Sequence, residues 1–170
     1  MKSTLLVFMF MIITLLCGCS GTDRPEPVYR STAPKIMFDK IISAMDDRDS
    51  EKLKSLFSQN ALEGTPNIDK QIEELMGMYK GKFVSNSHFN SGAGPGTSRN
   101  GVWVYLSINP IVDELVTDEA VYYLRFFSVA ANEDNPNDVG LWGIWLKLKV
   151  EGQVIDECEV DGGCQNRPSR

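Results

Sequence analysis

Residues that could carry out chemistry are few in this chain and lie far apart in the sequence. The 170 residues include one histidine, His88, within a segment over residues 82–89 whose pattern predicts a strand. A histidine that acts as a general base needs a second side chain to orient it, and the sequence identifies no such partner. We therefore assign no catalytic residue and keep His88 only as a candidate ligand contact.

A second group of candidates is aromatic and could form a binding surface. Trp103 and Tyr105 share one face of a predicted strand. Trp142 and Trp145 share a later strand, where their spacing places them on opposite faces unless a bulge at the intervening glycine changes this. We expect one of these tryptophans in the core and the other beside a cleft, where it would suit ligand or partner binding. The alternative is that both simply cover the helices.

Two loops have the composition of ion sites but lack the required spacing. Residues 92–96 are rich in glycine, yet no Gly-Lys-Ser/Thr ending and no helix follows them, as a phosphate-binding loop would need. Residues 132–138 offer many oxygen atoms but lack the glycine and the terminal glutamate of an EF-hand loop. We predict a flexible hairpin connection for the first and a solvated turn for the second, with no metal ligand.

The N-terminus carries the most specific chemical signal. Residues 1–4 include one positive charge, and residues 5–16 are almost entirely apolar. This run has the length of a secretory signal core and is shorter than the roughly 20 residues that span a bilayer. The stretch Leu16-Cys17-Gly18-Cys19 resembles the lipobox of bacterial lipoproteins, which implies cleavage before Cys19 and lipidation of its thiol. An ordinary secretory signal that contains cysteines is the alternative.

Removal of Cys17 and lipidation of Cys19 would leave two of the four cysteines, Cys158 and Cys164. An even pair outside the cytoplasm suggests a disulfide, and two glycines between them would allow so short a loop to close. Two free thiols on a frayed tail are the alternative. Two cysteines alone cannot complete a structural zinc site.

The composition indicates one acidic domain held by a linker. Removing residues 1–18 takes away only one of 17 basic residues, so 16 basic face 23 acidic residues and the charge is −7. Such a chain lacks the basic surface that neutralises nucleic-acid phosphates. We predict a signal peptide over residues 1–18, a lipidated N-terminus and flexible linker over 19–33, one domain over 34–160 and a tail over 161–170.

Hydrophobic periodicity changes near Gly81 from helical to strand-like. A helical period predicts three helices, with apolar stripes at Phe38, Ile41, Ile42 and Met45, at Leu53, Leu56 and Phe57, and at Ile68, Ile72, Leu75, Met76 and Tyr79. A period of two then predicts four to five strands, over residues 82–89, 102–108, 117–131, 139–150 and 153–160. This order favours an α+β fold in which three N-terminal helices pack on one curved antiparallel sheet.

The same segments carry a family resemblance. Phe38-x-x-Ile41-Ile42-x-x-Met45 and Asp49-x-x-Lys52-Leu53-Lys54-x-Leu56-Phe57 resemble the opening of nuclear transport factor 2-like domains, which are cone-shaped α+β folds. Asn67-Ile68-Asp69-Lys70-Gln71-Ile72 and Asp134-Asn135-Pro136-Asn137-Asp138-Val139-Gly140-Leu141 are similar to a branch of lipoproteins known only as a domain of unknown function. The resemblance covers roughly residues 35–150 and implies a fold without an activity.

Some enzymes of that superfamily place an aspartate, tyrosine or histidine inside the cone. The loose counterparts here are Tyr105, Tyr122, Tyr123 and Asp156, and none of them falls in a matching motif. A buried tyrosine in a sheet is usually a core residue whose hydroxyl is satisfied. The resemblance therefore adds no catalytic residue.

Together these features predict a membrane-anchored lipoprotein that faces outside the cytoplasm and binds a small molecule, peptide or protein without catalysis. No cofactor and no nucleic-acid partner is expected. The candidate ligand contacts are Trp103, Tyr105, Trp142, Trp145 and His88. The alternatives are an enzyme that uses the cone cavity for proton transfer or hydrolysis, and a structural homodimer.

Overall fold

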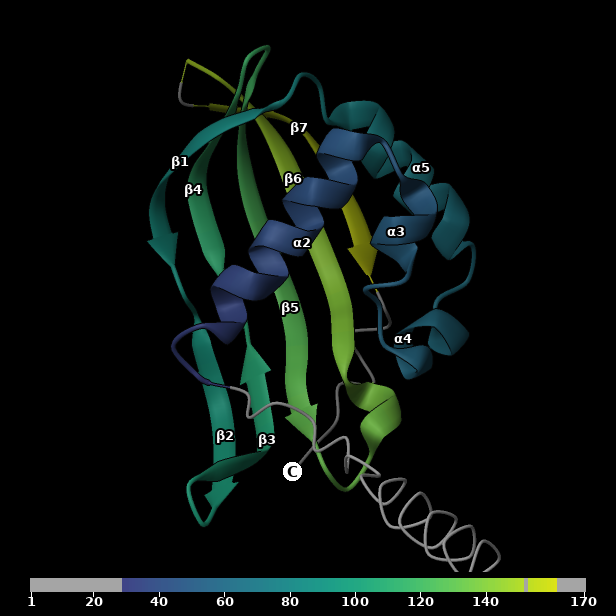
Figure 1. The fold of residues 1–170 in the computed structure, drawn as a ribbon. Helices are drawn as coiled ribbons and strands as arrows, with labels where there is room; N and C mark the ends of the chain where they lie inside the picture. The colour runs from purple at the N-terminus through teal and green to yellow at the C-terminus, as the bar shows by residue number, and fades with distance from the viewer. Residues whose placement is uncertain (1–28, 152, 162–170) are drawn as a thin grey trace, which may run out of the picture.

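The computed structural model describes residues 29–151 and 153–161, which form one antiparallel sheet with helices on a single face (Figure 1). The helices are α2 (Ala33–Asp47), α3 (Ser50–Lys54), α4 (Gln59–Gly64) and α5 (Ile68–Met78). The strands are β1 (Phe83–Asn90), β2 (Ala93–Arg99), β3 (Val102–Ile108), β4 (Ile111–Thr117), β5 (Val121–Asn132), β6 (Gly140–Val150) and β7 (Gln153–Asp161), with the 3-10 helix η1 (Pro136–Asp138) before β6. None of these described helices has the length and apolar composition needed to cross a membrane.

The longest helix, α2, follows from its sequence. Pro34 lies in its first turn, where the missing N–H costs no hydrogen bond. Its stripe of Phe38, Ile41 and Met45 is buried against the sheet. The helix ends where Arg48 adopts a left-handed conformation with φ of 56°. Figure 1 shows α2 lying diagonally across the sheet, with α3, α4 and α5 beyond it on the same side.

The described part of the chain has one α-helix more than the sequence predicts. The predicted helices correspond to α2, α3 and α5, and Asp49 caps α3 by accepting a hydrogen bond from the Lys52 backbone N–H at 2.8 Å. The additional helix α4 is a single short stretch that begins when the Ser58 hydroxyl accepts from the Ala61 N–H. It lacks an apolar stripe, so periodicity does not reveal it.

The described residues form seven strands where four to five were predicted, because β2 and β4 were not predicted; β1 and β2 lie along one row of the sheet, and β3 and β4 along the next. β1 pairs with β4 and β2 pairs with β3, while β4 and β3 both lie along the same edge of β5. β6 pairs with the other edge of β5, and β7 completes the sheet. The seven strands thus form five rows in chain order. The flexible connection predicted for residues 92–96 is wrong, because all but the first of these residues belong to strand β2.

The two faces of the sheet differ in what they contact. The inner face lies under the helices and carries Tyr122, Leu124 and Phe126 of β5, all fully buried. The outer face carries the alternate residues of the same strand, including Tyr123 and Arg125, which are half-buried. A bulge at Trp142 adds one residue to β6 opposite the step from Phe127 to Ser128.

Candidate ligand-binding groove

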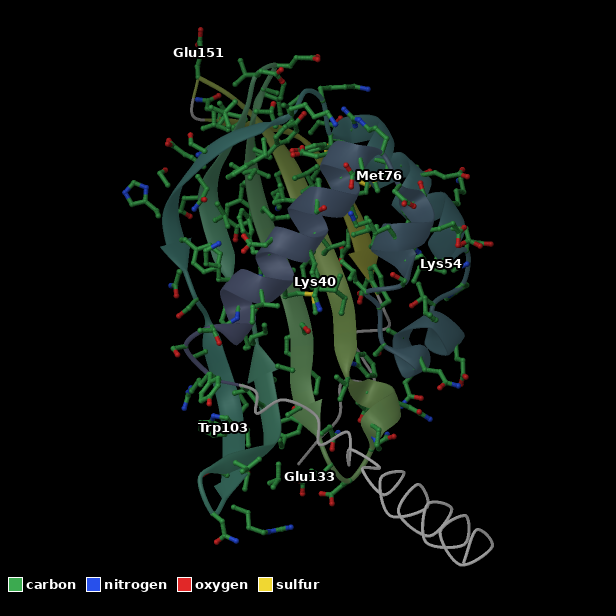
Figure 2. All side chains as sticks on the ribbon, in the orientation of Figure 1. Lys40, Lys54, Met76, Trp103, Glu133 and Glu151 are labelled. Carbon is green, nitrogen blue, oxygen red and sulfur yellow. The ribbon has the colours of Figure 1, made fainter. Side chains whose placement is uncertain are left out.

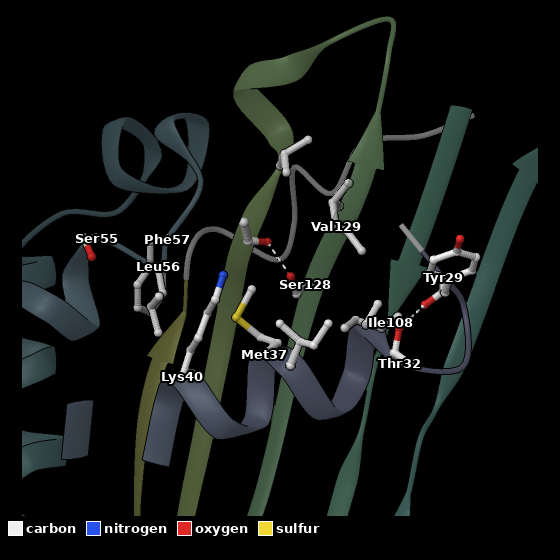
Figure 3. A pocket seen from close by; sticks show the side chains of 15 residues that line it. Tyr29, Thr32, Met37, Lys40, Ser55, Leu56, Phe57, Ile108, Ser128 and Val129 are labelled. Carbon is white, nitrogen blue, oxygen red and sulfur yellow. Dashed lines mark hydrogen bonds between the residues drawn. The ribbon is translucent and has the colours of Figure 1, made fainter. Parts of the chain in front are cut away.

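A groove of about 740 Å³ lies between α2 and the inner face of the sheet (Figure 3). This volume lies within the range of 300–1,000 Å³ that is usual for small-molecule sites. Most of its lining is apolar. The groove is lined by Tyr29, Thr32, Ala33, Ile36, Met37, Lys40, Ser55, Leu56, Phe57, Ile108, Ser128, Val129, Ala130, Val139 and Gly140.

The floor of the groove is the inner face of the sheet. Ile108 ends β3 and Val129 lies in β5, and both are buried within the core. The backbones of these strands are fixed beside one another by the pairing of Ile108 with Ser128. The Ser128 hydroxyl donates to the Gly140 carbonyl at 2.8 Å, so this polar group is already satisfied. The floor is therefore rigid and largely apolar.

One wall of the groove is the segment of residues 55–57 that follows α3. It is attached to β6 because the Ser58 N–H donates to Leu141 O at 2.9 Å and the Leu141 N–H donates to Leu56 O at 2.8 Å. Gly140 permits this approach. Its φ is 135°, and a Cβ atom there would lie 2.6 Å from the Ser58 nitrogen. A glycine at this position thus brings the wall close to the floor.

The opposite wall is a second stripe of α2. Ala33, Ile36, Met37 and Lys40 follow the spacing i, i+3, i+4 and i+7 and all line the groove. Ile36 is 52% exposed and, together with Met37, adds apolar surface to this wall. Figure 3 shows the Lys40 side chain extending from α2 toward the wall formed by Leu56 and Phe57.

The rim at the start of α2 is held to the hairpin of β2 and β3. Tyr29 O accepts from the N–H groups of Thr32 and Ala33, which forms a turn into the helix. The Arg30 guanidinium donates to Gly94 O at 3.1 Å and lies 5.6 Å from the centre of the Trp103 ring. Tyr29, Arg30 and Thr32 belong to residues 19–33, the segment predicted as a flexible linker. The last residues of that segment therefore already contact the folded domain.

Lys40 gives the groove its charge. Among the described residues that line the groove there is no aspartate or glutamate, and no described residue forms an ion pair with Lys40. The neighbouring carboxylate of Asp39 instead pairs with Lys35 at 2.7 Å. Lys40 therefore places one uncompensated positive charge beside an apolar surface, in a chain whose net charge is −6.

The five ligand contacts that the sequence suggests do not line this groove. His88 is exposed on β1 with φ of 51°, and its ring lies 3.2 Å from the Ser87 hydroxyl. Trp103 and Tyr105 are half-buried on β3, and Figure 2 shows Trp103 near the far end of that strand from Lys40. Trp142 is 3% exposed, and its indole N–H donates to Asp138 O at 2.8 Å.

Trp145 instead lines a second hollow of about 530 Å³ on the outer face, which we call the outer hollow. Its ring lies over Gly143, where a Cβ atom would come within 2.6 Å of it. The Arg125 guanidinium lies 5.4 Å from the ring centre, and its Nε–H donates to Asn109 Oδ1 at 2.9 Å. The outer hollow is lined by Tyr123, Arg125, Trp145, Lys147, Val154, Glu157, Cys158 and Glu159.

The tyrosines considered as acid–base groups serve different roles. The Tyr122 hydroxyl donates to Met78 O at 3.0 Å and accepts from the Lys80 N–H at 2.8 Å. Burial raises the pKa of Tyr122, which keeps this hydroxyl protonated. Tyr123 lies on the outer face, and Asp156 is exposed on β7. Tyr122 and Asp156 line one hollow of about 670 Å³, but Tyr105 and Tyr123 do not, so the four candidates do not converge on one site.

The acidic turn before β6 holds itself together. Asp138 is 4% exposed, and its two carboxylate oxygens accept from the side-chain amides of Asn60 at 2.6 Å and Asn132 at 3.0 Å. Over the described part of the chain, no group of three or more His, Cys, Asp or Glu side chains is placed to hold a metal ion. The turn joins α4 to β6 and so supports the end of the groove.

Two of the predicted covalent sites lie outside the described residues. These are Cys19, predicted to carry a lipid, and Cys164, the predicted disulfide partner of Cys158. Cys158 itself is half-buried on β7, and burial raises the pKa of its thiol. The disulfide and the lipidation stay predictions.

Sequence reasoning missed the groove although one signal for it exists. The stripe of Ala33, Ile36, Met37 and Lys40 runs beside the core stripe of the same helix, so α2 carries more apolar surface than one contact needs. The remaining lining comes from segments that approach only in the fold, such as Phe57 and Val139. Their positions in the sequence carry no such signal.

Comparison with known proteins places most of this fold in one family. The model of the family described as "Domain of unknown function (DUF5104)" matches residues 40–152. This range includes α3, α4, α5 and strands β1 to β6. A search of curated proteins finds no match to the chain. Because the match spans more than half of its length, the chain belongs to the DUF5104 family of domains of unknown function.

Proposed function

We propose that this chain is a membrane-anchored lipoprotein whose domain, a nuclear transport factor 2-like cone, binds a small apolar molecule in the groove outside the cytoplasm. The observation that carries the proposal is the groove itself. An exposed apolar surface is costly to keep in water, and in soluble domains such surfaces commonly mark interaction sites. Here Ile36 and Val139 stay 52% and 42% exposed on opposite sides of one hollow.

Binding without catalysis suits the polar groups of the groove. Of the groups that line it, the Ser128 hydroxyl donates to a backbone carbonyl and the Thr32 hydroxyl donates to Tyr29 O. No described residue of the lining offers a carboxylate with which Lys40 could share a proton in acid–base work, and the adjacent Asp39 pairs with Lys35. The lining can thus solvate an apolar body and orient one polar end, which is what a binding site requires.

The anchor rests on the sequence of the N-terminus. The apolar run before Leu16-Cys17-Gly18-Cys19 has the length of a signal core, and the lipobox resemblance names Cys19 as the acceptor. Metabolic labelling with palmitate tests this directly. We expect label on the wild-type chain in the membrane fraction and none on Cys19→Ser, and label on Cys19→Ser would contradict the assignment.

The groove is tested with an uncharged probe, a long-chain alcohol that carries a photoactivatable diazirine, on the full chain in nanodiscs of neutral lipid. We expect cross-links in peptides of α2 and β5. Ile36→Glu should reduce them at least about fivefold, because a carboxylate beside the bound chain would have to be desolvated. Ile36 lies in the fourth position of α2, where an acidic side chain is compatible with the helix.

The matched control is Ile155→Glu. Ile155 is 59% exposed, belongs to β7 and does not line the groove, so this substitution adds the same charge elsewhere. It should leave the cross-links in α2 and β5 unchanged. Equal loss in both variants, or labelling confined to peptides outside the groove, would contradict the proposed site.

A further inference from the structure

We propose that the occupant of the groove is a single-chain amphiphile with one acidic head, a long-chain carboxylate taken from the membrane to which the protein is attached. This inference rests on the proposed function and adds the chemical class of the ligand. Three observations support it: Lys40 has no ion pair among the described residues, the described lining of the groove contains no acidic residue, and only ten residues separate Tyr29 at the rim from the predicted anchor at Cys19.

The first step concerns charge. Lys40 is the one cation among the described residues that line the groove, and two carboxylates of α2, those of Asp39 and Asp47, have other partners. Asp39 accepts two contacts from Lys35, at 2.9 and 2.7 Å, and Asp47 pairs with Lys52 at 2.7 Å. An ammonium group beside an apolar surface gains most from an anion that brings its own apolar body.

The second step concerns the rest of the surface. The chain carries 23 acidic and 17 basic residues, so its general field repels anions. Recognition of an acidic ligand must then be local. One ammonium group matches one negative charge, and a volume of about 740 Å³ suits a single acyl chain better than a phospholipid with two chains.

The third step concerns position. Tyr29, which lines the rim of the groove, is only ten residues from Cys19. Ten residues span at most about 35 Å when fully extended. If Cys19 is lipidated, the rim is held within that distance of the bilayer surface. An amphiphile that leaves the bilayer therefore meets the groove at a high local concentration.

The experiment uses the full chain in nanodiscs of neutral lipid and two diazirine probes of equal length, a carboxylic acid and the corresponding alcohol. We expect the acid to label peptides of α2 and β5 about five to tenfold more strongly than the alcohol at pH 8. Lys40→Met should remove this preference while retaining labelling by the alcohol. Lys40→Arg should keep it, because the charge remains.

Lys35→Met is the matched control, since it removes the same charge from the same helix but from an existing ion pair with Asp39. It should leave the preference for the acid intact. Equal labelling by acid and alcohol in the wild type, or an equal effect of Lys40→Met and Lys35→Met, would overturn the proposed ligand class and leave the groove as an apolar site. Failure of both probes to label α2 and β5 would instead overturn the proposed function.

Both lysines are exposed, so neither substitution is expected to disturb the fold. Thermal unfolding of each variant checks this, with equal melting temperatures expected. Competition with unlabelled anions shows whether the groove recognises an acidic amphiphile or any free anion. Unlabelled oleate should displace the acid probe, whereas inorganic phosphate at the same concentration should not. Displacement by phosphate would show that Lys40 binds free anions and would overturn the amphiphile.

Discussion

The two hollows of this domain lie on opposite faces of the same sheet and differ in how their charges are partnered. In the outer hollow, Lys147 pairs with Glu157 at 2.7 Å, and Arg125 both stacks on Trp145 and donates to Asn109. In the groove, Lys40 has no ion-pair partner among the described residues, and Ile36 is exposed beside it. The outer hollow is lined by aromatic side chains whose neighbours already contact them, whereas the groove is lined by an exposed apolar side chain and by a lysine without a described ion pair.

This difference shows why residue type alone is a poor guide to a binding site. A tryptophan whose ring covers Gly143 and carries a guanidinium has already made its contacts, so it contributes to stability. Lys40, in contrast, lies beside an apolar wall and has no counter-ion among the described residues. Surfaces left incomplete by their own chain are the ones that can gain from a ligand.

The largest expected difference between the two faces is in stability. Trp142→Ala should lower the free energy of unfolding by about 3–5 kcal/mol, because it opens a cavity at a buried site and leaves the Asp138 carbonyl without its donor. Trp145→Ala, at a half-buried site, should cost about half as much. Urea denaturation measures both.

Labelling of the groove by the alcohol probe is a second measurement that should distinguish Trp142→Ala from Trp145→Ala. Trp142→Ala should also weaken labelling of the groove by the alcohol probe, since Asp138 leads directly into Val139 and Gly140 of the lining. Trp145→Ala should not change it. If Trp145→Ala abolished ligand binding while Trp142→Ala only destabilised the fold, the outer hollow would be the ligand site and the comparison would be reversed.

A smaller effect is expected at alkaline pH from two tyrosines under the helices. Burial raises the pKa of both Tyr79 and Tyr122, and the hydrogen bond from the Tyr79 hydroxyl to Asp46 raises that of Tyr79 further. A raised pKa in the folded state means that the stabilisation is complete below the ordinary tyrosine pKa of about 10 and is lost as the pH rises above it.

Tyr122→Phe tests this with a defined sign. At pH 7 it should cost about 1–2 kcal/mol, because Met78 O and the Lys80 N–H lose their partner. The double variant Tyr79→Phe and Tyr122→Phe should unfold with less dependence on pH between 9 and 11 than the wild type. Urea denaturation across this range measures it, and an unchanged pH slope would show that these hydroxyls do not control alkaline unfolding.

Local sequence signals predicted the helices better than the strands. The stripe of Phe38, Ile41, Ile42 and Met45 predicted α2, and the apolar residues of β3 and β6 predicted those strands, whereas β4 (Ile111–Thr117) was not predicted. Strand β2 escaped because Ala93–Arg99 is composed of glycine, proline and small polar residues. It is extended because it pairs with Val102–Ile108, so its partner overrides its own low propensity.

The site depends even more on tertiary structure. Lys40 and Val129 are neighbours only because α2 crosses the sheet diagonally, and Leu56 is nearby only because its carbonyl accepts from Leu141. No periodicity encodes either arrangement. Aromatic residues gave the sequence-based candidates instead, and their own contacts with Arg30, Arg125 and Asp138 became visible only with the fold.

The smallest effect is expected from the charges of the outer hollow. Side chains of Lys147 and Glu157 are 35% and 66% exposed, so solvent screens their attraction. Glu157→Gln should lower the free energy of unfolding by at most about 1 kcal/mol, and 1 M salt should remove most of the difference.

Glu119→Gln, which removes the same charge where no described ion pair exists, is the control and should have no effect. Since the hydrogen bond that Lys147 donates to Glu157 raises the pKa of Lys147, the small gain should persist at neutral pH and fade above about 10.4. A loss well above 1 kcal/mol that persists in salt would mean that the outer hollow is organised by its ion pair, and the contrast with the uncompensated Lys40 would then be sharper than exposure alone suggests.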